Sequence, residues 1–432
     1  MSRTLGRYFR YTESMSQSGH TETPTRVAPS ELFNTLVFFT WWVRLQQRVE
    51  AWSRSSRWTL VGVCALLGVA ARLWAQTLPG NWDFGQWINV STAALDGRDP
   101  YELFGYNYPP PWLVTLALIK AVTHSTETFR LGISLLLIVI DLGIALLLLR
   151  RGYGLAACLF LLSPVVIAIS GQHQQVEGIA VLFALAAMTV LAASQQDRIT
   201  ARDWQMAVLL GVSLSFKPVF LLLPLWLACR PGPWSPRLFR LLAPLGVFGV
   251  IFCSSFLVYP PREVIQKVLE YSGANNSPFI NAFVPGQLAP WVLDHGGGKL
   301  AFLVLLAAAG WLFRRLAPFE SALAYSITAV VFSWAVVNQY LAGPMAAVAV
   351  FLNVGFLIWL LLASLYLGGN VDVLNLWVLR SIQPHVLLDW PQVMRDLFPW
   401  ILGGWILFVF ASRQPGRLFF PKQLRDQQVI RG

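Results

Sequence analysis

Long apolar stretches recur along this chain, and several of them end at arginines. The stretch 129–149 ends at Arg150 and Arg151, and the stretch 397–411 is followed by Arg413. A helical crossing of the bilayer core needs about 20 apolar residues, and a helix satisfies its own backbone hydrogen bonds there. Hydrophobic residues make up 56% of the sequence and charged residues only 12%, against about 25% charged residues in soluble domains. The pattern predicts an all-α polytopic membrane protein.

The basic residues predict the orientation of the spans, because cytoplasmic loops are rich in Lys and Arg. We expect about 10–12 transmembrane helices, some broken or re-entrant, in the plasma membrane, with polar loops on the extracytoplasmic face. The expected parts are a cytoplasmic segment 1–57 with an interfacial helix over 32–52, a transmembrane domain 58–411 with its first outer loop at 76–111, and a cytoplasmic tail 412–432. The same topology explains the net charge of +11, so no nucleic-acid partner is expected.

Two charged residues interrupt apolar stretches. Lys217 is followed by Pro218 inside the stretch 208–227, and a hairpin-like pair of half-helices would return the chain to the cytoplasmic side. Such breaks are tolerated at membrane depth where they line a cavity or are buried in protein, so we expect Lys217 to point into a cavity. The alternative is that Lys217 only extends to an interface. Asp141 lies within another stretch and is expected to pair with a neighbouring helix.

Polar residues gather in the loops that this topology places outside. They are Asp83, Tyr101 and Tyr108 in the first loop, Gln172, His173 and Glu177 in a second, Asn275 in a third, and Asn338, Gln339 and Tyr340 in a fourth. A carboxylate beside a hydroxyl accepts its proton during group transfer, and an ammonium in a low-dielectric cleft attracts phosphate. Together with Lys217, these residues fit transfer from a phosphorylated donor.

Each of these residues also has a purely structural interpretation. Asp83 could cap a helix, and Tyr101 and Tyr108 could be aromatic residues of the membrane interface. Glu177 could simply favour the positive end of a helix dipole. The functional hypothesis therefore depends on whether these side chains lie close together.

The order of the motifs resembles that of the GT-C superfamily of membrane glycosyltransferases. The motifs that carry the resemblance, over about 58–344, are Asp83, Gly97-Arg-Asp-Pro-Tyr101, Tyr106-Asn-Tyr-Pro-Pro110, Ser163-Pro164 with Gly171-Gln172, and Phe216-Lys-Pro218. The chain looks most like bacterial polyprenol-phosphate-mannose-dependent α-mannosyltransferases. Glu177 and Asn338-Gln-Tyr340 are also similar to the catalytic subunit of glycosylphosphatidylinositol mannosyltransferase I.

The resemblance implies a GT-C type bundle, an extracytoplasmic site and a polyprenyl-phosphate sugar as donor, with mannose as the sugar. It implies that Asp83 deprotonates the acceptor hydroxyl, that Lys217 meets the donor phosphate, and that Gln172 and Tyr340 line the pocket. Family members often carry a histidine where this chain has Asn338 and Gln339, which is a departure from the pattern.

The expected reaction is a single inverting displacement that uses membrane lipid, a polyprenyl-phosphate sugar and a glycan or glycolipid acceptor. The sequence has no carboxylate cluster with the spacing of metal ligands, so we expect no divalent metal and no cofactor beyond the lipid-linked co-substrate. A polytopic transporter or flippase of a lipid-linked saccharide is the alternative, because it would also contain broken helices and intramembrane charges. An inverted internal repeat would favour that alternative, and none is evident in the sequence.

Overall fold

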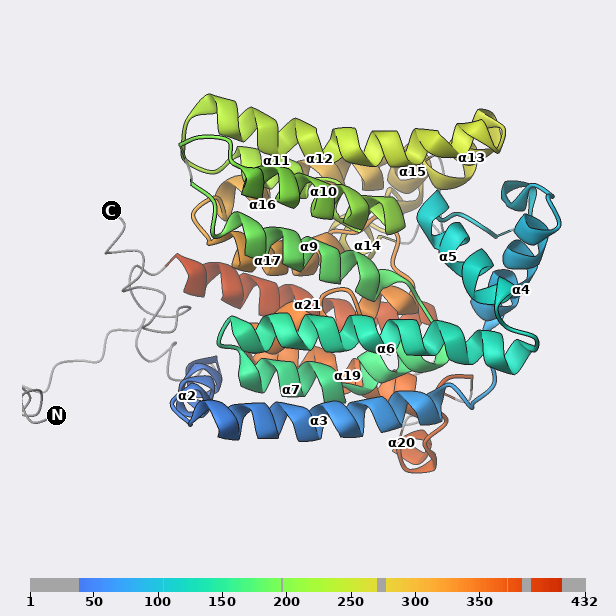
Figure 1. Cartoon of the computed structure of the whole chain (residues 1–432). Coiled ribbons are helices and arrows are strands. Elements are labelled where there is room, and N and C mark those ends of the chain that lie inside the picture. Colours follow the sequence, from blue (N-terminus) through green and yellow to red (C-terminus); the bar gives the residue numbers. More distant parts are fainter. Residues whose placement is uncertain are drawn as a thin grey trace, which may run out of the picture.

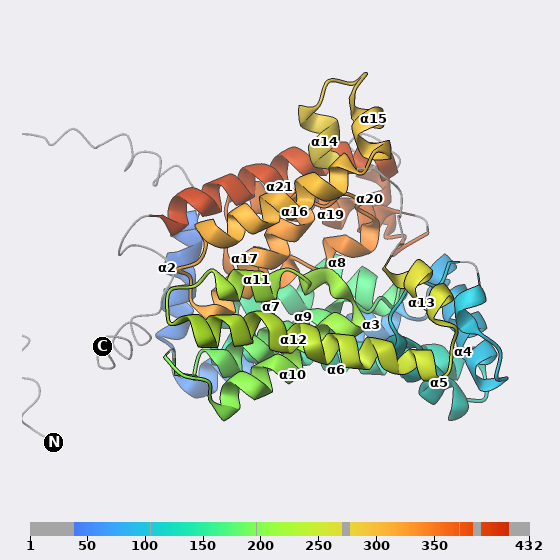
Figure 2. The same cartoon turned by 90° about the horizontal axis from the view of Figure 1, so that it is seen from above.

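The computed structural model describes residues 39–103, 105–195, 197–269, 277–370, 372–382 and 390–413, and within these ranges all regular elements are helices. Most long helices run side by side along one direction (Figure 1). The view from above shows the same direction, with α4 and α5 at one end and α2 at the other (Figure 2). The described residues therefore confirm the prediction of an all-α membrane protein.

The α-helices, in chain order, are α2 (Phe39–Glu50), α3 (Arg54–Ala75), α4 (Trp82–Leu95), α5 (Pro110–Ala121), α6 (Thr126–Arg150), α7 (Gly154–Leu162), α8 (Pro164–Val166), α9 (Glu177–Leu191), α10 (Ala201–Phe216), α11 (Leu223–Ala228), α12 (Trp234–Ser254), α13 (Pro261–Val268), α14 (Pro278–Phe283), α15 (Ala289–Asp294), α16 (Gly297–Leu312), α17 (Pro318–Val331), α18 (Met345–Val350), α19 (Val354–Gly369), α20 (Trp377–Ile382) and α21 (Trp390–Ser412). Shorter helical turns are η1 (Pro100–Glu102), η2 (Ile167–Gln172), η3 (Pro218–Phe220), η4 (Ser255–Leu257) and η5 (Asn338–Leu341).

Four helices in the described part of the chain are long and apolar enough to cross a bilayer, and they lie in α3, in α6, in α12 with η4, and in α21. Two bent pairs raise this number to 6 if each pair is one span. Fewer than the expected 10–12 spans meet the length criterion, because α5, α9, α16 and α19 are apolar but only 10–17 residues long. The membrane character of the chain follows from these helices.

The bundle is broken where the sequence places Lys217 and Pro218. The α10 helix ends at Phe216, and the axis turns by 119° into the segment of η3 and α11. Proline has no backbone N–H and disfavours helical geometry at the residue before it, and Lys217 is extended, with φ −155° and ψ 122°. The predicted break is confirmed. A second break, of 49°, separates α7 from the segment that begins at Pro164.

Of the helix predicted over 32–52, the part Phe39–Glu50 forms α2, which packs on the end of the bundle, and residues 32–38 lie outside the described residues. The indole Nε1 of Trp42 donates to the carbonyl of Ala349 at 3.0 Å, and the side chain of Gln46 donates to the carbonyl of Val350 at 3.1 Å. Arg44 on the same helix is exposed. One face of α2 is therefore fixed to the bundle, and the other carries charge outward.

A buried ion pair joins α3 to α6. Arg72 Nε lies 2.8 Å from Asp141 Oδ2, and the two side chains are only 1% and 4% exposed. Arg72 also donates to the carbonyls of Gly68 and Leu161 and to the hydroxyl of Ser170. This pair confirms the expectation that Asp141 meets a partner on a neighbouring helix.

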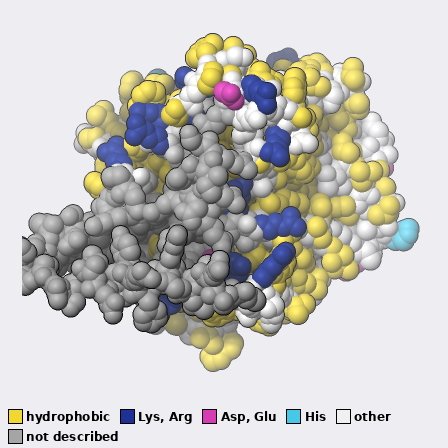
Figure 3. Space-filling model, turned by 60° about the vertical axis from the view of Figure 1, so that its left-hand side comes forward, with side chains coloured by type: hydrophobic (Ala, Val, Ile, Leu, Met, Phe, Trp, Pro, Cys, Tyr) yellow, Lys and Arg dark blue, Asp and Glu magenta, His cyan; other side chains and the backbone are white. Residues whose placement is uncertain are grey.

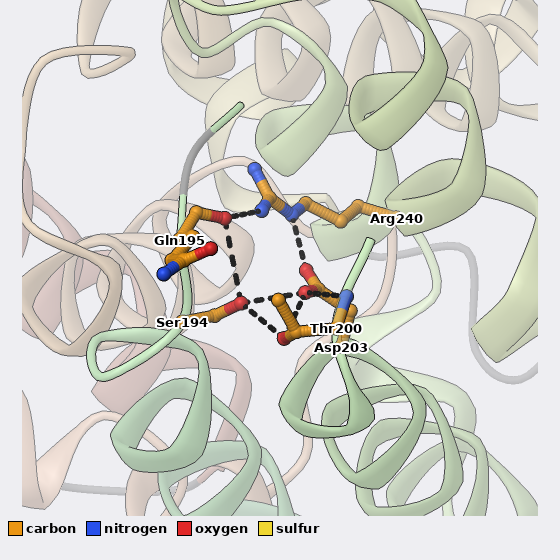
Figure 4. Close-up of polar contacts among 5 residues, drawn as sticks. All are labelled: Ser194, Gln195, Thr200, Asp203 and Arg240. Carbon is orange, nitrogen blue, oxygen red and sulfur yellow. Dashed lines mark hydrogen bonds and ion pairs between the residues drawn. The ribbon is translucent and has the colours of Figure 1, made fainter. Parts of the chain in front are cut away.

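A second buried pair ties the α9–α10 loop to α12. Asp203 accepts hydrogen bonds from Arg240 Nε at 2.8 Å, from Ser194 Oγ at 2.5 Å and from the Thr200 hydroxyl at 2.7 Å. Arg240 also donates to the carbonyl of Gln195 at 3.0 Å, so the guanidinium bridges the loop and the start of α10 (Figure 4). This network fixes the position of the α9–α10 loop relative to α12.

Candidate active site

Asp83 lies in the first turn of α4. This helix lies at the end of the bundle shown on the right of Figure 1. Asn81 is the N-cap of this helix, and its side chain accepts a hydrogen bond from the backbone N–H of Phe84 at 3.0 Å. The carboxylate of Asp83 is thus not needed as a cap. Its Oδ2 accepts a hydrogen bond from the Gln175 side chain at 2.6 Å and a longer one from Asn81 at 3.4 Å.

Gln175 is the residue that the sequence analysis missed. It follows η2, a π-helical segment, and it follows Gln174, whose φ is 58°. A π-helical turn and one left-handed residue rotate successive side chains away from α-helical positions. Gln174 consequently donates to Ser134 Oγ at 2.7 Å, whereas Gln175 turns toward Asp83. The run of polar residues before Glu177 was visible in the sequence, but the member that reaches Asp83 depends on these turns.

Tyr108 connects the first loop with two other parts of the chain. Its hydroxyl donates to the Gln175 side-chain oxygen at 3.1 Å and accepts from the Gln339 side chain at 3.4 Å. The ring is buried and packs edge-on against Trp87, with centroids 5.0 Å apart. Asp83, Gln175, Tyr108 and Gln339 therefore form one connected polar cluster.

Lys217 lies in the same cluster. It is buried and forms an ion pair with Glu177, the first residue of α9. Its Nζ lies 5.1 Å from the ring centroid of Tyr108 and 4.9 Å from that of Tyr340. Aromatic ring faces attract cations at such distances. The ammonium is thus held by one carboxylate and two aromatic rings, and Glu177 Oε2 is left without a hydrogen-bond partner.

The charges of the cluster act on Asp83. Burial raises the pKa of its carboxyl group, the positive charge of Lys217 opposes this rise, and the negative charge of Glu177 adds to it. The hydrogen bonds from Gln175 and Asn81 also favour the ionised form. A carboxylate with a raised pKa is a stronger base than an exposed one, so the site holds a base and a cation within electrostatic reach of each other.

An apolar cavity of about 160 Å³ adjoins the charged cluster. Glu177, Pro218 and Tyr340 line it together with Leu221 and Leu303, which are 39% and 46% exposed. The cavity therefore extends from the polar cluster toward the outer surface of the bundle. Pro218 at the predicted break lines the cavity, but Lys217 does not, which differs from the expectation that Lys217 points into it. Lys217 instead contacts Glu177 and Tyr340, two residues of the lining.

Three of the expected site residues have other surroundings. Gln172 donates to the carbonyls of Pro79 and Asp372, at 2.7 and 3.1 Å, and so fastens two loops. His173 is buried, its Nε2 has no hydrogen-bond partner, and burial lowers its pKa to about 4. Tyr101 packs against the rings of neighbouring tyrosines. These three side chains support the loops and are not in contact with Asp83 or Lys217.

The remaining expected residues divide between η5 and the loop at Asn275. Gln339 and Tyr340 belong to the cluster through their contacts with Tyr108 and Lys217. Asn338 begins η5 and is partly buried. Asn275 lies outside the described residues. The sequence thus identified most of the cluster, and the structure adds Gln175 to it.

The carboxylates of the described residues are spread through the fold, and no group of three or more His, Cys, Asp or Glu side chains among them could hold a metal ion. Comparison of the chain with protein-family models, curated proteins and solved structures gives no match. The functional argument therefore starts from the geometry of the Asp83 and Lys217 cluster.

Proposed function

We propose that this protein is a membrane glycosyltransferase that transfers a sugar from a polyprenyl-phosphate donor to an acceptor hydroxyl. One observation carries the proposal. Asp83 and Lys217 are far apart in the sequence, yet both belong to one cluster, in which Gln175 bonds to Asp83 and to Tyr108, and Lys217 lies over the Tyr108 ring. A base and a phosphate-binding cation are the two groups that such a transfer needs.

In the proposed reaction, the acceptor oxygen attacks the anomeric carbon while Asp83 accepts the hydroxyl proton. The bond between that carbon and the donor phosphate oxygen breaks, and the phosphate leaves with the bonding electron pair. Gln175 holds Oδ2 of Asp83, which leaves Oδ1 for the acceptor. A single displacement of this kind inverts the anomeric centre.

Lys217 binds the departing phosphate in this scheme. An ammonium group has three donors, so Lys217 can keep its ion pair with Glu177 and still donate to a phosphate oxygen. The nearby Tyr108 and Tyr340 rings restrict its position. The adjoining apolar cavity begins at Glu177 and Tyr340, where the lipid part of such a donor would start.

The sugar, the acceptor and the side of the membrane belong to the same proposal. Mannose follows from the resemblance described above, and a glycan or glycolipid supplies the hydroxyl. The arginine-rich loops lie at the end of the bundle opposite α4 (Figure 1), and such loops are typically cytoplasmic. The site would then face the extracytoplasmic side of the plasma membrane.

The test is transfer by the purified full-length chain in lipid nanodiscs, with a panel of polyprenyl-phosphate sugars and mass spectrometry of the labelled products. We expect Asp83→Asn to lower kcat about 10²- to 10⁴-fold with donor binding retained, because the amide cannot accept the proton. Asp96→Asn is the matched control, since Asp96 follows the same helix and its side chain is 53% exposed.

Full transfer activity in the Asp83→Asn variant would contradict the assigned role of Asp83. A wild-type protein that moves lipid-linked saccharides across liposomes but transfers no sugar would instead identify a flippase.

A further inference from the structure

A second charged cluster lies where the α11–α12 loop meets the α16–α17 loop, at the opposite end of the bundle from α4 (Figure 1). Arg230 of the first loop donates to the carbonyl of Leu316 in the second. Arg237 donates to the carbonyl of Ala228 at 2.5 Å, and Arg314 donates to the carbonyl of Trp311 at 2.9 Å. These bonds fix the guanidinium groups of Arg230 and Arg314 in the two loops and of Arg237 in the first turn of α12.

The thiol of Cys229, in the α11–α12 loop, is affected by cations from two segments. Burial raises the pKa of its thiol, and the guanidinium groups of Arg237 and Arg314 both oppose that rise. Positive charges from the first turn of α12 and from the α16–α17 loop therefore act on one thiol. Arg315 follows Arg314 directly and is exposed, which adds another positive charge to the same region.

Two tryptophans accompany these arginines. Arg237 lies over the ring of Trp234 at 5.5 Å, and Arg314 lies over the ring of Trp311 at 3.9 Å from the centroid. The two indoles are 68% and 59% exposed. Exposed tryptophans beside arginines at the ends of apolar helices are typical of the headgroup layer of a bilayer, and Trp234 begins a candidate membrane span.

Within the described part of the chain, no ion pair compensates the positive charge of this cluster. The ion pairs found among the described residues are five, and none of them includes Arg237, Arg314 or Arg315. Glu320, which interacts electrostatically with Arg230, is buried and accepts a hydrogen bond from Tyr153. Figure 3 shows Lys and Arg side chains gathered on this end of the molecule with hydrophobic side chains between them.

We propose that Arg237, Arg314 and Arg315, with Trp234 and Trp311, form a binding site for the headgroup phosphate of an anionic membrane phospholipid. Guanidinium groups bind phosphate through paired hydrogen bonds. The indoles place the site at headgroup depth.

The surface beside this site suits the rest of a lipid. Leu238 follows Arg237 directly in α12 and is 37% exposed, and Leu242, one turn further along, is 54% exposed. The two side chains provide an apolar surface for the acyl chains. The inference does not depend on the proposed transferase activity.

The test measures retention of phosphatidylglycerol by the full-length protein in detergent micelles, by native mass spectrometry during a lipid titration. The test variant replaces Arg237, Arg314 and Arg315 with glutamine. The variant loses charge-assisted hydrogen bonds from several guanidinium groups to one phosphate, so we expect retention to be weaker by on the order of a hundredfold. Phosphatidylcholine serves as the uncharged comparison lipid, and its retention should not change.

The matched control replaces Arg44, Arg48 and Arg54 with glutamine, which removes the same charge from α2 and the start of α3. This control should retain phosphatidylglycerol within about threefold of the wild type, since the charge near a membrane acts over only about 10 Å. Equal losses in both triple variants would overturn the proposal, because they would show a general charge effect without a site.

A third variant, with lysine at positions 237, 314 and 315, keeps the charge and separates binding from folding. It should retain lipid at an intermediate level, because an ammonium group lacks the paired donors of a guanidinium. Helical circular dichroism confirms that each variant is folded. A folded glutamine variant that binds phosphatidylglycerol as the wild type does would also overturn the proposal.

Discussion

Replacing Gln175 with leucine removes the side chain that joins Asp83 to Tyr108. The bond from Gln175 to Asp83 Oδ2 is 2.6 Å long and involves a charged acceptor. Such a hydrogen bond contributes about 1.5–3 kcal/mol. Burial already raises the pKa of Asp83, and the Gln175 amide, like Lys217, opposes that rise. The Gln175→Leu variant should therefore have a still higher pKa at Asp83.

The sign of the effect on activity follows from the role proposed for Asp83. A base works in its ionised form, so a higher pKa moves the acidic limb of the pH–rate profile to higher pH. At a pH below this limb, the loss of 1.5–3 kcal/mol corresponds to about 10- to 100-fold less of the ionised form. Activity should recover at alkaline pH, because the carboxylate itself is still present.

The assay is the pH dependence of kcat/KM for sugar transfer, which reports the pKa of the essential base in the free enzyme. Gln174→Leu is the control, since Gln174 is also buried but bonds to Arg130 and Ser134 instead of Asp83. The reasoning is refuted if the acidic limb of Gln175→Leu coincides with that of the wild type.

Two further predictions concern the buried ion pairs. Asp141→Leu leaves the Arg72 guanidinium buried without its carboxylate, which should lower the free energy of unfolding by about 3–5 kcal/mol. The double variant with Arg72→Met should recover most of this loss, because no unpaired charge is then buried. Denaturation in detergent measures both changes. Asp203→Ala should cost a similar amount, about 3–5 kcal/mol, because Arg240 stays buried and loses its ion pair. A loss of unfolding free energy below about 1 kcal/mol in either single variant would contradict the prediction, because the pair would then stabilise the fold no more than an exposed surface pair does.

The break in the bundle is a feature that the local sequence can predict. Proline removes a backbone donor wherever it stands, so the end of α10 before Pro218 could be predicted from local chemistry. The pairing of Asp141 could be predicted for a similar reason, since an isolated charge is costly among apolar helices. The number of spans was harder to predict, because α9 and α19 are apolar over only 15 and 16 residues.

The candidate site also contains residues that the sequence could predict and residues that it could not. Asp83 and Lys217 could be predicted, because a charged residue beside an apolar span carries a large desolvation cost and so signals a function or a partner. Gln172 and Gln175 could not be told apart, since both lie in one polar run. The π-helical turn and the left-handed Gln174 decide that Gln175 reaches Asp83 while Gln172 fastens two loops.

The sequence by itself determined that the chain is helical, that it is suited to a bilayer and that it breaks at Lys217, because hydropathy and proline geometry act on each residue where it stands. Only the tertiary structure decided that Tyr108, Gln175 and Lys217 share one cluster beside an apolar cavity. Such contacts depend on how distant helices are rotated and shifted against one another, and packing sets those quantities for the whole bundle at once.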